Sequence, residues 1–119
     1  RLTMDSDPAI WNCKNMLEPF SWLIPRVAQV KQDLFEPEVR EAWRDRVFAT
    51  MALCPQHRFF VTTAYPRIYH DYVQTIANDR SEYVTWRVSA SDVLNDLGLG
   101  HLATGEGPKW PLLNVEFIE

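Results

Sequence analysis

Apolar residues recur at about every fourth position in the middle of the chain, and this period predicts a helix. Pro37 suits its first turn, where the missing N–H of proline costs nothing, and Pro55 ends it. The expected apolar face consists of Val39, Ala42, Trp43, Val47, Phe48 and Met51. Charged residues occupy the opposite face, as expected for a helix that packs on one side.

The residues after Pro55 predict a strand and a second helix. Aromatic and β-branched residues form the run FFVTT at positions 59–63. A near-continuous run of this length is typical of a strand covered on both faces. Pro66 then begins a helix whose expected apolar face consists of Tyr69, Tyr72, Val73 and Ile76.

The flanking segments add further predicted elements. A strand is expected within residues 23–30, beginning after Pro25, and a last strand at 112–118. The alternation at 83–88 predicts another strand. A short helix should follow it, capped by Ser89 or Ser91 and closed by Gly98. Residues 1–19 show no clean period and are expected to form an exposed lead-in with a short helix or loop.

The order strand, helix, strand, helix is typical of a parallel sheet with right-handed crossovers. We therefore predict one α/β domain over residues 1–119, with a small, open, mainly parallel sheet of three or four strands and flanking helices. Such a sheet has the form of a piece of a β/α barrel, because closing a barrel takes about eight strands.

Composition excludes some classes of protein. The 119 residues are 46% hydrophobic and 24% charged, which is typical of a globular domain. The net charge of −4 argues against general affinity for nucleic-acid backbones. Without an apolar run of membrane-spanning length or a signal-peptide pattern, a cytoplasmic protein is expected. Cys13 and Cys54 are expected to be buried, reduced thiols, with a disulfide as the alternative.

Motifs for catalysis are missing from the sequence, so no catalytic residue, metal or cofactor is expected. The glycines near residue 100 follow no predicted strand and make a weak phosphate-loop candidate. His57, His70 and His101 have no metal-ligand spacing and are expected to be surface residues. The basic residues are interpreted as solvated surface rather than one strip; they include Arg26, Lys31, Arg58, Arg67, Arg80 and Arg87.

Ligands of open parallel sheets bind beyond the carboxyl ends of the strands. The predicted strand ends carry polar residues there: Gln29, Lys31, Gln32, Asp33, Thr62, Thr63, Tyr65, Glu116 and Glu119. Asp33 with Thr63 is the best polar pair among them. It fits either a binding site or a hydrogen bond that braces two loops.

Four stretches of the chain carry a family resemblance: LEPFSWLIPR, DLFEPEV, DRVFATMALCPQHRFFVTTAYP and WPLLNVEFIE. Together they resemble a family of phage and bacterial proteins of unknown function whose members look like radical-SAM barrels. The resemblance covers residues 17–72 and 110–116, and MALCPQH is its most specific part.

The chain departs from that family at its chemistry. Members carry an upstream cysteine cluster for an iron–sulfur centre, whereas this chain has only Cys13 before the first predicted strand, and a cluster needs three or four thiolates. The family's Thr-Lys-Arg-Pro is here Thr63 to Pro66 without either cation. The matched positions are therefore expected to be scaffold: Asp33, Leu34, Phe35, Arg46, Phe48, Met51, His57, Phe59, Thr63 and Pro66.

Three functional hypotheses follow. The first is a non-catalytic binding protein encoded by a phage or mobile element, located in the host-cell cytoplasm, which inhibits a host defence complex as anti-CRISPR proteins do. Its partner would be a host protein or a second copy. The second is a degenerate enzyme fragment that keeps ligand binding at the strand ends, and the third is a nucleic-acid-binding accessory protein, a direct partner that the charge disfavours.

The first hypothesis rests on the expected open sheet, which leaves a strand edge to be covered. The last strand is the expected exposed edge. Trp110 and Phe117 are its expected anchors, and Glu116 is a charge that discourages indiscriminate pairing. Replacing both aromatic residues with alanine is expected to preserve the fold and to abolish the partner complex.

Overall fold

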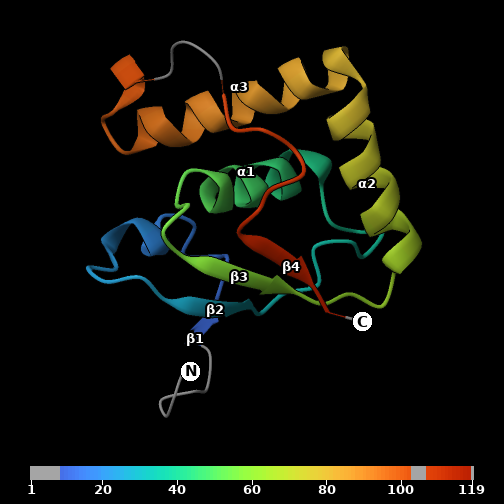
Figure 1. Cartoon of the computed structure of the whole chain (residues 1–119), viewed down its shortest axis with the longest axis horizontal. Coiled ribbons are helices and arrows are strands. Elements are labelled where there is room, and N and C mark those ends of the chain that lie inside the picture. The colour runs from blue at the N-terminus through green and yellow to red at the C-terminus, as the bar shows by residue number, and fades with distance from the viewer. Residues whose placement is uncertain (1–8, 103–106, 119) are drawn as a thin grey trace.

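The computed structural model describes residues 9–102 and 107–118. Its centre is a sheet of four parallel strands in the order β1-β2-β3-β4, which is also their order in the sequence (Figure 1). The strands are β1 (Ala9–Trp11), β2 (Val27–Val30), β3 (Arg58–Val61) and β4 (Val115–Phe117). The predicted α/β class with a small open parallel sheet is confirmed.

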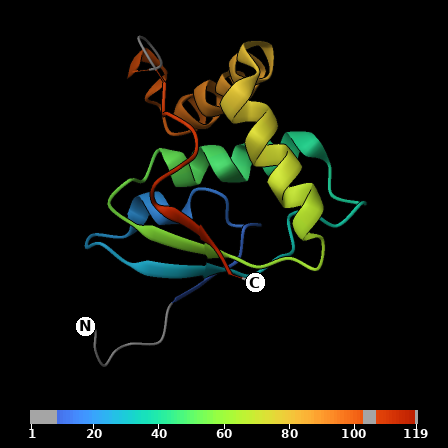
Figure 2. The same ribbon diagram turned by 45° about the vertical axis from the view of Figure 1, so that its right-hand side comes forward.

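Three helices, α1 (Glu41–Ala52), α2 (Pro66–Asn78) and α3 (Arg80–Asp96), lie on one side of the sheet. Figures 1 and 2 show α1 next to the strands, α3 stacked beyond α1, and α2 running from α3 back toward the end of β3. Two 3-10 helices, η1 (Glu18–Ser21) and η2 (Gly100–Leu102), complete the described elements.

Strand register decides which side chains face the helices. Two rows of adjacent residues point inward: Ala9, Ala28, Phe59 and Val115, then Trp11, Val30, Val61 and Phe117. The members of these rows in the two central strands are buried. The inward rows pack into one core, whose largest fully buried members include Trp11, Phe35, Phe48, Phe59 and Trp86.

The prediction that β3 is covered on both faces is wrong. The helices cover one face, and on the other face Phe60 is only half-buried and Arg58 is exposed. An apolar run cannot distinguish these cases, because a strand needs only alternate residues for one buried face.

The predicted strand at 83–88 is also wrong, since these residues lie inside α3. Asp79 caps that helix by accepting hydrogen bonds from the amides of Ser81 and Glu82 (2.9 and 3.3 Å). The buried face, Trp86, Ala90 and Val93, has helical spacing. Ser89 and Ser91 consequently lie inside α3 and cap nothing, whereas Gly98 closes it with a φ of 76°, as predicted.

Other boundaries differ from the prediction by a few residues. Helix α1 begins at Glu41, because residues 36–39 form a turn in which the Val39 amide donates to the Glu36 carbonyl (2.9–3.0 Å class, 3.0 Å). Within its predicted apolar face Ala42 is exposed and Trp43 half-buried. Strand β1 was not predicted, since three residues are too short to show a period.

Candidate functional site

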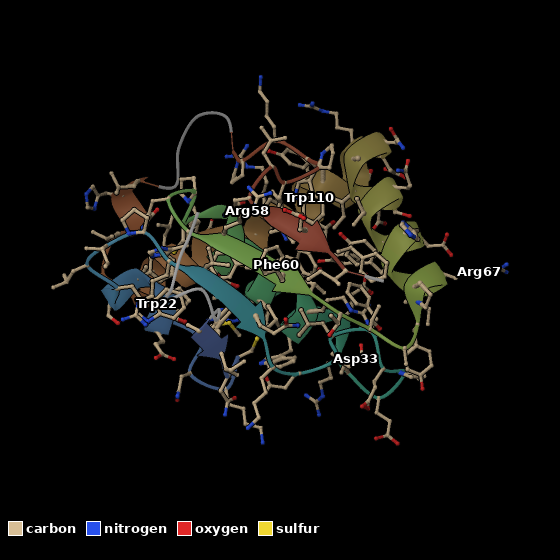
Figure 3. All side chains as sticks on the ribbon, turned by 60° about the horizontal axis from the view of Figure 1, so that its bottom comes forward. Trp22, Asp33, Arg58, Phe60, Arg67 and Trp110 are labelled. Carbon is tan, nitrogen blue, oxygen red and sulfur yellow. The ribbon has the colours of Figure 1, made fainter. Side chains whose placement is uncertain are left out.

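The most distinctive surface is the sheet face without helices, which we call the bare face. Its residues are Ile10, Val27, Gln29, Arg58, Phe60 and Glu116, all on the strands and all pointing away from α1. Figure 3 turns this side toward the viewer and shows Arg58 and Phe60 along β3. Parallel sheets are normally covered on both faces, so an uncovered one is a candidate contact surface.

The bare face combines apolar and charged groups. Ile10 is 62% exposed and Val27 43% exposed. Beside them Arg58 of β3 forms an ion pair with Glu116 of β4. Glu116, a predicted binding residue, thus lies on this face and neutralises its neighbour there.

Both edges of the sheet are open among the described strands. β1 pairs only with β2, and β4 only with β3. The prediction that the last strand forms an exposed edge is confirmed, with β1 as the second edge. Such edges present unpaired backbone N–H and C=O groups to a partner.

The predicted pair Asp33 and Thr63 does meet beyond the carboxyl ends of β2 and β3. The Thr63 hydroxyl donates to Asp33 Oδ1 at 2.6 Å, and the amides of Phe35 and Ala64 donate to Oδ1 and Oδ2 at 3.0 and 2.9 Å. Burial acts to raise the pKa of Asp33, but these hydrogen bonds and nearby Arg44 outweigh it and lower that pKa. Both carboxylate oxygens are occupied, so the pair braces two loops.

Tyr65 follows this brace and does not complete a pocket with it. Its amide donates to the Thr63 hydroxyl oxygen at 2.9 Å, while its side chain is 37% exposed. Of the predicted site residues, the structure therefore brings together Asp33, Thr63 and Tyr65 at the strand ends. Glu116 lies elsewhere, on the bare face.

The predicted anchors Trp110 and Phe117 contact other parts of the same chain. The Trp110 ring lies 5.1 Å from Trp86 and 5.7 Å from Phe48, measured between ring centroids. Phe117 stacks on Tyr69 at 4.4 Å. Both rings are half-buried against the core. Their role in binding a partner stays a prediction, but their first contacts are internal.

His57 is buried, so the prediction of a surface histidine is wrong for this residue. Its Nδ1 accepts from the Arg26 amide and its Nε2 donates to the Pro19 carbonyl, both at 3.0 Å. Burial and Arg26 lower its pKa against the opposing effect of the Pro19 carbonyl, which favours the neutral ring. His57 thus joins η1, β2 and β3 as scaffold, which is the role that the family resemblance implies.

The chain's thiols do not fit an iron–sulfur cluster. Cys13 and Cys54 are buried and free, and burial raises the pKa of each to about 12, so both are protonated thiols rather than thiolate ligands. Among the described residues no group of three His, Cys, Asp or Glu side chains is placed to hold a metal ion. In the same residues no helix has the length and apolar character needed to cross a membrane.

Comparisons with known proteins were made by family and by individual match. No curated protein and no solved structure matches the chain. A family profile described as "Protein of unknown function (DUF5131)" matches residues 3–104, which is most of the sequence. The chain therefore belongs to the DUF5131 family of proteins of unknown function.

Proposed function

We propose that the chain is a non-catalytic binding protein that acts by protein–protein contact through its bare sheet face, and that a second copy of the chain covers this face. The observation that carries the proposal is a parallel sheet with helices on one face only and with both edges open. Ile10 at 62% exposure lies on the uncovered side.

The topology supports strands as the covering material. Four parallel strands in sequence order, with every described helix on one side, match the arrangement in half of a β/α barrel. In a complete barrel of about eight strands the inner face is filled by side chains and no edge remains. Two copies of a four-stranded sheet supply that number, with β4 of each copy beside β1 of the other.

The chemistry of the bare face is compatible with self-association. Phe60 and Ile10 supply apolar area, and Arg58 and Glu116 supply one charge of each sign. In a two-fold contact each copy presents the same patch, so every positive charge can meet a negative charge of its partner. The same mixture disfavours a nucleic-acid backbone, which would repel Glu116.

Narrower features of the proposal come from the family resemblance. The barrel-like strand order supports a distant relationship to radical-SAM barrels, and the resemblance supports phage or mobile-element origin and a host protein as the eventual target. Inhibition of a host defence complex would be one such activity. The enzyme-fragment alternative has less support, because both oxygens of Asp33 are already occupied at the strand ends.

The experiment measures oligomeric state across a dilution series by light scattering coupled to size exclusion. We expect a dimer that dissociates on dilution. Ile10→Glu places a charge on the bare face and should give a monomer that keeps its circular dichroism spectrum.

Val88→Glu is the matched control, because Val88 has nearly the same exposure (58%) but lies on α3. It should leave the dimer intact. A parent protein that stays monomeric at every concentration overturns the proposal, as does equal loss of the dimer in both variants. Cross-linking that maps the dimer contact to the helices would also overturn it.

A further inference from the structure

A second candidate site lies in the helical layer, away from the bare face. Where α2 meets α3, the segment that leads into β4 passes beside the corner and encloses a cavity of about 540 Å³. We call it the corner pocket. Its volume falls in the range of small-molecule sites, about 300–1,000 Å³.

The corner pocket gathers positive charge. Arg80 and Arg87 of α3 and Lys109 of the returning segment line it. Three cations around one cavity are notable in a chain of net charge −4. Asp79 is the acidic residue in its lining, and its carboxylate already accepts hydrogen bonds from the Ser81 and Glu82 amides. The local balance therefore favours an anion.

The other walls are aromatic and fixed in place. Tyr83 and Trp110 line the cavity, and the Tyr83 hydroxyl donates to the Pro108 carbonyl at 2.7 Å, which ties the returning segment to α3. Gly107 allows this close approach, because a Cβ there would lie 2.5 Å from Arg87 Nε and 2.9 Å from the Tyr83 hydroxyl oxygen. The Trp110 ring is held by Trp86 behind it.

We propose that the corner pocket binds a small anion that carries a flat apolar ring, such as an aryl phosphate or aryl carboxylate. The cationic side chains pair with the anionic group, while Tyr83 and Trp110 contact the ring. The amides at the start of α3 play no part, since Asp79 occupies them. This site goes beyond the proposed function and does not depend on self-association.

The test titrates the protein with phenyl phosphate, benzoate, inorganic phosphate and phenol, following the amide shifts of Gly107 and Lys109 by NMR. We expect saturable shifts with phenyl phosphate or benzoate, and weaker binding of inorganic phosphate and phenol, which each lack one half of the ligand. Lys109→Gln and Arg80→Gln should each weaken binding about three- to tenfold, as for losing one exposed charge contact.

Arg67→Gln is the control, since Arg67 is an exposed arginine on α2 that does not line the pocket. It should not change the affinity. Three outcomes would overturn the proposal: no saturable shift with either ring-bearing anion, equal binding of phenol, or equal weakening by Arg67→Gln. Binding that persists in the Ile10→Glu monomer would show that the pocket works without a dimer, and loss of binding there would contradict this independence.

Discussion

The Thr63 hydroxyl donates a 2.6 Å hydrogen bond to the carboxylate of Asp33, which lies thirty positions earlier in the chain. The contact ties the loop after β2 to the loop after β3 at the end of the sheet where ligands of parallel sheets usually bind. Because the backbone amides of Phe35 and Ala64 use the same carboxylate, Asp33 organises this end of the molecule rather than serving a ligand.

Acid should weaken this brace. The folded pKa of Asp33 is lowered, so its stabilisation is present above the unfolded pKa, about 4, and is lost as the pH falls through the folded value. Asp33→Asn places an amide donor opposite the Ala64 N–H and should lower the free energy of unfolding by about 1–3 kcal/mol at pH 7. Urea unfolding at neutral and acidic pH should show this difference shrinking in acid.

Two controls define that result. Thr63→Val removes one hydrogen bond and should cost about 1 kcal/mol, less than Asp33→Asn. Asp92→Asn changes an exposed carboxylate on α3 and should leave stability unchanged. A difference between the parent and Asp33→Asn that grows toward acid would show that the ionised carboxylate is not what braces the loops.

Asp45 should respond to pH in the opposite sense. Burial raises its pKa, with Glu41 and Glu82 adding to the rise, although the Tyr72 hydroxyl donates to Asp45 at 2.6 Å. A raised folded pKa means that the contribution of Asp45 to stability is greatest below the unfolded pKa and falls as the pH rises through the folded value.

Asp45→Asn removes the charge and keeps an acceptor for Tyr72, so at pH 7 it should be at least as stable as the parent. Its advantage should narrow in acid, where the parent carboxyl is protonated. Asp45→Ala is the comparison, because it leaves the Tyr72 hydroxyl without this acceptor and should cost about 1–3 kcal/mol. Unfolding free energies that rank Asn below Ala at pH 7 would contradict the assignment.

The architecture was predictable where the pattern is long. The periodic face of α2 and the glycine end of α3 were found from sequence, and so was the parallel order of β2 and β3. The short elements were not. Three residues of β1 carry no period, and in α3 the bulky residues at 83–88 alternate well enough to imitate a strand, whereas the decisive signal is the Asp79 cap.

The candidate surfaces divide in the same way. Asp33 and Thr63 could be paired in advance, because the ends of neighbouring parallel strands must meet. The bare face could not be found, since it depends on every described helix lying on one side. The corner pocket joins Arg80 and Arg87 to Lys109 from a distant segment, and no spacing in the sequence encodes that approach.

The buried hydroxyl of Thr50 offers a route to higher stability. Thr50 is fully buried in α1, and its Oγ1 has no hydrogen-bond partner among the described residues. Thr50→Val replaces that hydroxyl with a methyl group of similar size and should raise the free energy of unfolding by about 1–2 kcal/mol. Thr50→Ser keeps the hydroxyl, loses the methyl and should be less stable than the parent. Thermal unfolding that ranks Val below the parent would reveal a partner for the hydroxyl.

The last prediction separates core aromatics from the contact surface. Trp110 is half-buried and its ring contacts Trp86, Phe48 and Tyr72, so Trp110→Ala should lower the free energy of unfolding by about 2–4 kcal/mol, near the range for large buried aromatics. This differs from the sequence-based expectation that the fold tolerates the change. Ile10→Glu should leave the unfolding free energy of the monomer within about 0.5 kcal/mol, because its side chain faces solvent there. Denaturant unfolding of both variants under dilute conditions is the measurement. An unchanged midpoint for Trp110→Ala would mean that the ring contributes little to the core and is available to a partner, as the sequence alone suggested.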